Sequence, residues 1–96
     1  MNSVVITGAN RGIGLELCKQ YLANGNRVFA TYRNSMGGLE EIESPYLSTF
    51  KLDVRYEKDV RAFVNSIDCD VDILINNAGV SDGRWQSISE IVMKHA

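Results

Sequence analysis

Residues 3–17, SVVITGANRGIGLEL, decide the fold that we expect for this chain. Val4, Val5 and Ile6 form a run of β-branched residues, which is typical of a parallel strand covered on both faces. Glycines follow at positions 8, 12 and 14, and apolar side chains recur four apart at positions 13, 17 and 21, as on one face of a helix. The stretch therefore predicts a buried strand, a glycine-rich turn and the start of a helix.

The glycine-rich turn is a candidate anion site. Where such a turn leads into a helix N-terminus, free backbone N–H groups and the helix dipole both favour a phosphate. The spacing is T-G-x-x-x-G-x-G, whereas the standard dinucleotide fingerprint is G-x-G-x-x-G. A glycine cluster alone also fits a structural turn. Here it stands between a predicted strand and a predicted helix, which is the context that favours phosphate binding.

The rest of the chain alternates between strand and helix patterns. Further strands are expected at residues 27–32, 47–54 and 71–75, and helices at residues 12–24 and 57–67, with a short helix within 33–44 and a weak one at 88–96. Gly25 is placed to end the first helix in a left-handed cap. Strands that alternate with helices imply βαβ units with right-handed crossovers. The predicted fold class is α/β, with a partial doubly wound parallel sheet in a single domain over residues 1–96.

Composition and charge narrow the class of protein. The chain has 96 residues, is 45% hydrophobic and carries a net charge of −2, with no basic excess to suggest nucleic acid or an anionic membrane surface. No apolar run approaches the roughly 18 residues of a membrane span. Cys18 and Cys69 fit no metal or redox spacing, and Cys18 is expected in the core. We therefore expect a cytoplasmic protein with no nucleic-acid or membrane partner.

Polar or glycine-rich sequence follows each of the four predicted strands. In a doubly wound sheet, ligands bind outside the carboxyl ends of the strands. The segments at those ends are residues 8–14, Tyr32 with Arg33, Asp53 with Val54, and residues 76–79, which are expected to form a turn. Taken singly, Asp53 and the asparagines also fit ordinary turn residues. Together they predict a binding site at one edge of the sheet.

These segments resemble the cofactor-binding half of the short-chain dehydrogenase/reductase family. TGANRGIG at residues 7–14 is similar to the phosphate turn of that family, Asp53-Val54 to its adenine-contact pair, and NNAG at residues 76–79 to the motif after its fourth strand. The sequence TGANRGIGLEL, with VFATYRN after it, is similar to the sequences of small carbonyl reductases of the sniffer and C-factor type. The resemblance spans essentially the whole chain and implies a Rossmann-type sheet with strand order 3-2-1-4.

The resemblance also implies roles for individual residues. The backbone of residues 10–14 would hold the cofactor phosphates, and Asp53 and the Val54 amide would contact the adenine. Asn77, Ala78 and Gly79 would line the adenosine ribose, while the Thr7 hydroxyl would tie the turn to a neighbouring loop. The predicted cofactor-binding residues are Gly8, Asn10, Arg11, Gly12, Ile13, Gly14, Arg33, Asp53, Val54, Asn77, Ala78 and Gly79.

The preferred cofactor can be argued from charge. NAD sites commonly place an acidic residue about 20 residues beyond the glycines, on the ribose 2′-hydroxyl. That position here holds Tyr32 followed by Arg33, and Arg11 lies inside the turn. Two guanidinium groups suit a 2′-phosphate, which they can bind through bidentate hydrogen bonds. We predict NADP(H) over NAD(H); the alternative is that both arginines are solvated surface residues.

The catalytic residues that the resemblance implies are missing. Hydride transfer in the family uses a serine and a tyrosine with lysine four residues later, and none of Tyr21, Tyr32, Tyr46 and Tyr56 is followed by lysine at that spacing. We therefore expect a fragment of a reductase of about 250 residues, inactive alone, which meets a small carbonyl substrate only in a full-length form. Its last strand would present an unpaired apolar edge through which copies of the chain could associate.

Two other functions stay open. The first is a non-catalytic nucleotide-binding or redox-sensing module, in which bound NADPH changes the affinity for a partner. The second is an interaction fragment that pairs through the exposed edge of its sheet. Binding of NADPH without turnover would favour the first, and neither binding nor turnover would favour the second.

Overall fold

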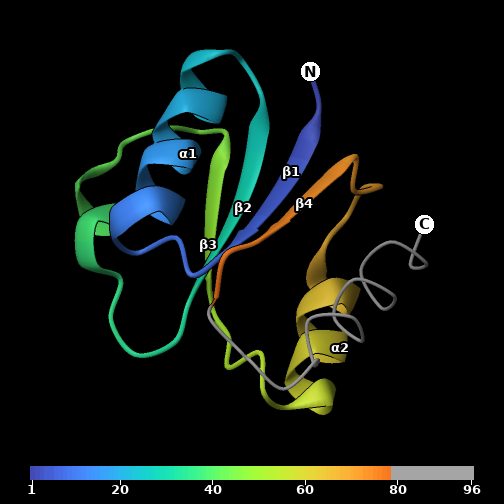
Figure 1. Cartoon of the computed structure of the whole chain (residues 1–96). Coiled ribbons are helices and arrows are strands. Elements are labelled where there is room, and N and C mark those ends of the chain that lie inside the picture. The colour runs from blue at the N-terminus through green and yellow to red at the C-terminus, as the bar shows by residue number, and fades with distance from the viewer. Residues whose placement is uncertain (79–96) are drawn as a thin grey trace.

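The computed structural model describes residues 1–78, which form a parallel sheet with helices on both of its faces (Figure 1). The elements in chain order are β1 (Ser3–Thr7), α1 (Gly12–Ala23), β2 (Arg27–Tyr32), the 3-10 helix η1 (Gly37–Glu41), β3 (Leu47–Lys51), α2 (Glu57–Ser66) and β4 (Ile73–Asn76). The four strands lie in the order β3-β2-β1-β4, which confirms the predicted α/β fold and strand order. Within the described residues, no helix is long and apolar enough to cross a membrane.

β1 is the central strand of the chain. It pairs in parallel with β2 on one side and with β4 on the other, so that Val5 lies opposite both Phe29 and Leu74. Val4, Val5 and Ile6 are fully buried, because strands flank them and apolar side chains cover both faces of the sheet. The run of β-branched residues is thus a strand covered on both faces, as predicted.

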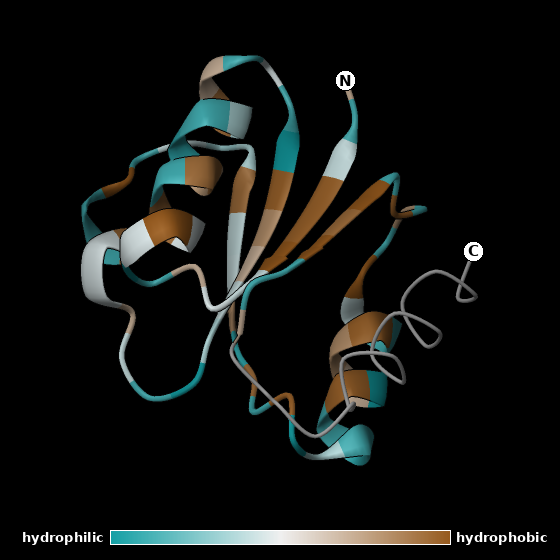
Figure 2. Cartoon of the chain, in the orientation of Figure 1, coloured by the Kyte–Doolittle hydropathy of each residue, from teal (hydrophilic) through white to brown (hydrophobic). Residues whose placement is uncertain are grey.

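The hydrophobic core is divided into two clusters by the sheet. On one face, Val5 and Phe29 pack with the Val60, Phe63 and Val64 side chains of α2. The β1 and β2 residues next to Val5 and Phe29 in the sequence point to the other face of the sheet. There they pack with α1 and η1. Figure 2 shows hydrophobic residues along β1 and β4, and both hydrophobic and hydrophilic residues in each of the two α-helices.

The prediction that Ile13 begins a buried apolar face of α1 is wrong. Ile13 is 74% exposed, whereas Gly14 and Cys18 are buried against the sheet. Ile13 lies in the first turn of α1, at the open edge of the sheet where no described element covers it. Cys18 is a core residue as expected, and burial raises the pKa of its thiol to about 11.

Element boundaries differ from the prediction at the two outer strands. β3 ends at Lys51 rather than at residue 54, because the chain turns away after the Leu52 N–H donates to the Tyr32 carbonyl. β4 begins at Ile73 and includes Asn76, which pairs with Thr7 and therefore belongs to the strand rather than to a turn. The first helix ends at Ala23, one residue earlier than predicted, and Gly25 after it has the predicted left-handed conformation, with φ 82°. The loop and helix expected after residue 80 lie outside the described residues.

Gly14 is the residue through which α1 approaches the sheet most closely. A Cβ at this position would collide with the Gly8 carbonyl oxygen and lie 2.6 Å from Asn77 Nδ2. Gly14→Ala should therefore lower the free energy of unfolding by about 1–3 kcal/mol, since neither the turn nor the end of β4 can move aside without loss of packing. Urea denaturation measures the change.

Lys19→Ala is the control for this substitution, because Lys19 lies on the exposed face of the same helix. Its effect should stay within about 0.5 kcal/mol of the parent chain. Equal stability of the two variants would show that α1 does not depend on the small residue at position 14.

Candidate functional site

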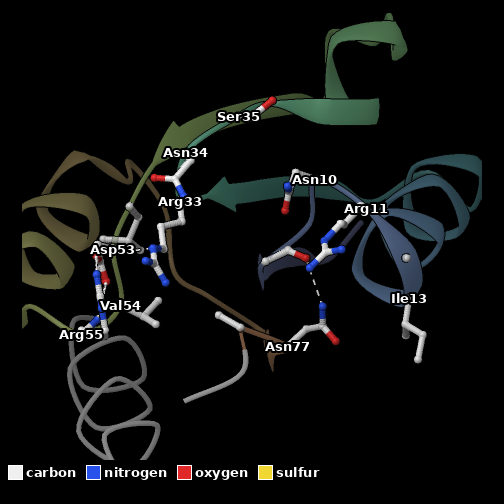
Figure 3. A pocket seen from close by; sticks show the side chains of 14 residues that line it. Asn10, Arg11, Ile13, Arg33, Asn34, Ser35, Asp53, Val54, Arg55 and Asn77 are labelled. Carbon is white, nitrogen blue, oxygen red and sulfur yellow. Dashed lines mark hydrogen bonds and ion pairs between the residues drawn. The ribbon is translucent and has the colours of Figure 1, made fainter.

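A cleft of about 700 Å³ lies at the carboxyl ends of the strands (Figure 3). Of the residues predicted to bind the cofactor, all those within the described chain line it except Gly14, which is buried beneath the glycine turn. Gly79 lies outside the described residues. The cleft therefore collects segments that are far apart in the sequence, at the edge of the sheet where the prediction placed them.

The glycine turn forms one wall of the cleft. Gly8 and Gly12 have φ angles of 63° and 59°, a backbone conformation that residues with a Cβ rarely adopt. The turn leads into α1, whose N-terminus receives no side-chain cap from Arg11. Because the first N–H groups of a helix have no partner within the helix, this end of α1 can bind an anion.

The Thr7 hydroxyl fixes the glycine turn to the end of β4. Oγ1 donates to Asn76 Oδ1 at 2.9 Å and accepts from the Ala78 N–H at 3.1 Å, and the residue is only 1% exposed. Asn77 Nδ2 donates in turn to the Gly8 carbonyl oxygen at 3.0 Å. The predicted role of Thr7 as a tie between the two segments is confirmed by these contacts.

The opposite wall contains Asp53 with two arginines. Arg55 donates from Nε and Nη2 to the two carboxylate oxygens of Asp53 at 2.9 and 2.7 Å, and its backbone N–H donates to Oδ1 at 3.0 Å. Arg33 Nε lies 3.9 Å from Oδ2. Hydrogen bonds from Arg55 are the main cause that lowers the pKa of Asp53 to about 2. The carboxyl group expected to meet an adenine therefore already has a partner within the chain.

The two predicted phosphate-binding arginines lie apart. Arg33 follows β2 and extends toward Asp53, whereas Arg11 lies beside the start of α1. Figure 3 shows the cleft between them. They line the same site, but they do not form one cationic cluster as the sequence argument implied.

Sequence reasoning missed part of the lining. Asn34, Ser35, Leu52 and Arg55 also line the cleft. All four lie within two positions of a predicted residue in the sequence, so a longer segment at each strand end would have included them. For Arg55 a further signal was an arginine two residues after an aspartate at a strand end. Within residues 1–78, no group of His, Cys, Asp or Glu side chains is arranged to hold a metal ion.

Comparison with known proteins agrees with this architecture. Residues 2–95 match the family described as short chain dehydrogenase. The chain belongs to this family. It is 40% identical over 88 residues to a (+)-neomenthol dehydrogenase of Arabidopsis thaliana, a match that covers 79% of this chain and 30% of that protein. This confirms the predicted family, whose members are oxidoreductases that bind nicotinamide dinucleotides.

Solved structures show the same arrangement of elements. A structure described as the putative carbonyl reductase sniffer of Caenorhabditis elegans matches with a TM-score of 0.85 and 27% identity, over 97% of this chain and 52% of that one. A closed form of serine dehydrogenase complexed with NADP+ matches with a TM-score of 0.74 and 26% identity, over 96% of this chain and 46% of that one. This short-chain dehydrogenase sequence thus spans about a third to a half of the length of these relatives.

Removal of the Thr7 hydroxyl tests the link between the turn and β4. Thr7→Val keeps the shape of the side chain but leaves the Ala78 N–H and Asn76 Oδ1 without this partner, which should cost about 1–3 kcal/mol of unfolding free energy. Thr7→Ser keeps the hydroxyl and should cost less. Urea denaturation compares the three chains, and a larger loss for Ser than for Val would show that the methyl group, not the hydroxyl, matters.

The lowered pKa of Asp53 predicts a pH dependence of stability. The carboxylate is stabilised in the folded chain, so its contribution is complete above the unfolded pKa near 4 and is lost as pH falls toward the folded pKa of about 2. Asp53→Asn should therefore lose less unfolding free energy than the parent chain between pH 4 and pH 2. Urea denaturation at several pH values measures this, and parallel curves for the two chains would contradict it.

Proposed function

We propose that this chain forms the cofactor-binding part of an NADP(H)-dependent reductase that acts on a small carbonyl compound. The proposal depends on one observation: the N-terminus of α1, which has no side-chain cap, and Arg33 line the same cleft. The first is suited to a pyrophosphate and the second to the 2′-phosphate that distinguishes NADP from NAD.

The electrostatics of the cleft support NADP(H). Where an NAD site would place a carboxylate after the second strand, this chain has Tyr32 and Arg33. The carboxylate of Asp53 follows β3 instead and is bound by Arg55. An anionic 2′-phosphate would therefore meet Arg33 without an unpaired carboxylate beside it. The resemblance to a serine dehydrogenase structure that contains NADP+ supports the same choice.

The other lining residues have roles that follow from their positions. The turn between Gly8 and Gly12 would hold the pyrophosphate, and Asp53 and Val54 lie where the adenine would bind. Asn77 and Ala78, which are fixed to the turn, would line the ribose. The nicotinamide of a bound cofactor would supply or accept the hydride. The chain's own residues would bind and orient the cofactor.

Replacement of Arg33 tests the choice of cofactor. The parent chain should bind NADPH more tightly than NADH, and Arg33→Ala should reduce the ratio of the two affinities by about tenfold, the loss of one charge-assisted contact to phosphate. Isothermal titration calorimetry with each dinucleotide measures the ratio.

Arg61→Ala is the matched control, because Arg61 lies on the surface of α2, pairs with Glu57 and does not line the cleft. Its affinity ratio should equal that of the parent chain. Tighter binding of NADH than NADPH by the parent chain would refute the NADP(H) proposal, as would an unchanged ratio in Arg33→Ala.

A further inference from the structure

The carboxylate of Asp53 lies between the guanidinium groups of Arg55 and Arg33, and Arg55 is the nearer of the two. Arg55 contacts both oxygens of Asp53, whereas Arg33 reaches only Oδ2, at 3.9 Å. The Asp53 side chain is 19% exposed and that of Arg33 is 58% exposed. Figure 3 shows Arg33 extending from the end of β2 into the cleft, with Arg55 on the far side of Asp53.

We propose that Arg55 is a positioning residue that determines cofactor specificity. By binding the carboxylate of Asp53, Arg55 leaves the guanidinium of Arg33 available for the 2′-phosphate of NADP(H). The inference rests on the NADP(H) preference proposed above and assigns a cause to it. Arg55 itself would act through Asp53 and Arg33 rather than on the phosphate.

Competition for Arg33 is the physical basis of this role. A carboxylate without Arg55 would attract Arg33 into a closer ion pair and would also repel a phosphate bound next to it. With Arg55 in place, two cations face one anion, and a net positive charge stays at this end of the cleft. A fork-shaped contact from an arginine satisfies both oxygens of the carboxylate at once, so Asp53 gains little from Arg33 in addition.

The local backbone holds Arg55 against the Asp53 carboxylate. Asp53 and Arg55 lie in the turn between β3 and α2, where the Tyr56 N–H donates to the Asp53 carbonyl oxygen at 3.2 Å. The Arg55 guanidinium also lies 5.7 Å from the centre of the Tyr56 ring. These contacts keep Arg55 on the α2 side of Asp53, opposite Arg33.

Arg55→Gln removes the ion pair between Arg55 and Asp53 and tests the positioning role of Arg55. In the 96-residue chain, the ratio of NADPH to NADH affinity should fall by about fivefold, the value of a partly exposed ion pair, through weaker NADPH binding. Arg61→Gln makes the same change of charge on the surface of α2 and should leave the ratio unchanged.

A second substitution separates this role from a structural one. Asp53→Asn removes the group that competes for Arg33, so its addition to Arg55→Gln should restore the ratio of the parent chain. Any loss of an adenine contact at Asp53 affects both dinucleotides equally and cancels in the ratio. Arg55→Lys keeps the charge without the fork, should reduce the ratio less than Arg55→Gln, and supplies the test if the Gln variant does not fold.

The outcomes distinguish the two proposals. A parent chain that prefers NADPH, with a ratio that Arg55→Gln leaves unchanged, overturns this inference and leaves the proposed function intact. A fall in the ratio that Asp53→Asn does not restore also overturns it, because Arg55 would then contact the phosphate directly. A parent chain without preference for NADPH overturns the proposed cofactor, and the role of Arg55 with it.

Discussion

Parallel pairing of β1 with both β2 and β4 is the constraint on which the site depends. Because parallel strands point the same way, their carboxyl ends meet at one edge of the sheet, and the segments that follow them line one cleft. At the end of this pairing, the Thr7 hydroxyl joins the last residue of β1 to Asn76 of β4 and to Ala78 after it. The positions of the glycine turn and of the segment after β4 are therefore set by the same contacts.

Glycine is required at this junction for two separate reasons. Gly8 and Gly12 adopt left-handed backbone conformations, whereas Gly14 has no room for a side chain between α1 and the turn. The same close approach that excludes a Cβ brings the first N–H groups of α1 to the cleft. Packing and the proposed anion binding thus depend on the same short segment, so a substitution there would affect both.

Charge in the cleft is organised around Asp53. The family resemblance assigned this residue to an adenine, and in the structure its carboxylate forms ion pairs with Arg55 and, more distantly, with Arg33. A site for a dinucleotide with an additional phosphate must offer cations without uncompensated anions beside them. In the proposed site this arrangement would meet that condition, because Arg55 contacts both oxygens of Asp53 whereas Arg33 lies farther from the carboxylate.

Local sequence determined the central strand, the glycine turn, the two α-helices and the strand ends that form the cleft. Each depends on residues close in the chain: consecutive β-branched residues, glycine spacing, and an apolar stripe in α2. Tertiary structure alone decided that Ile13 is exposed, that Asn76 of β4 pairs with Thr7 of β1, and that Arg55 binds Asp53. The exposure of a side chain and the length of a strand depend on which distant segment lies alongside. The partner of a charged side chain depends on how the backbone turns after the strand. Local periodicity predicts neither of these.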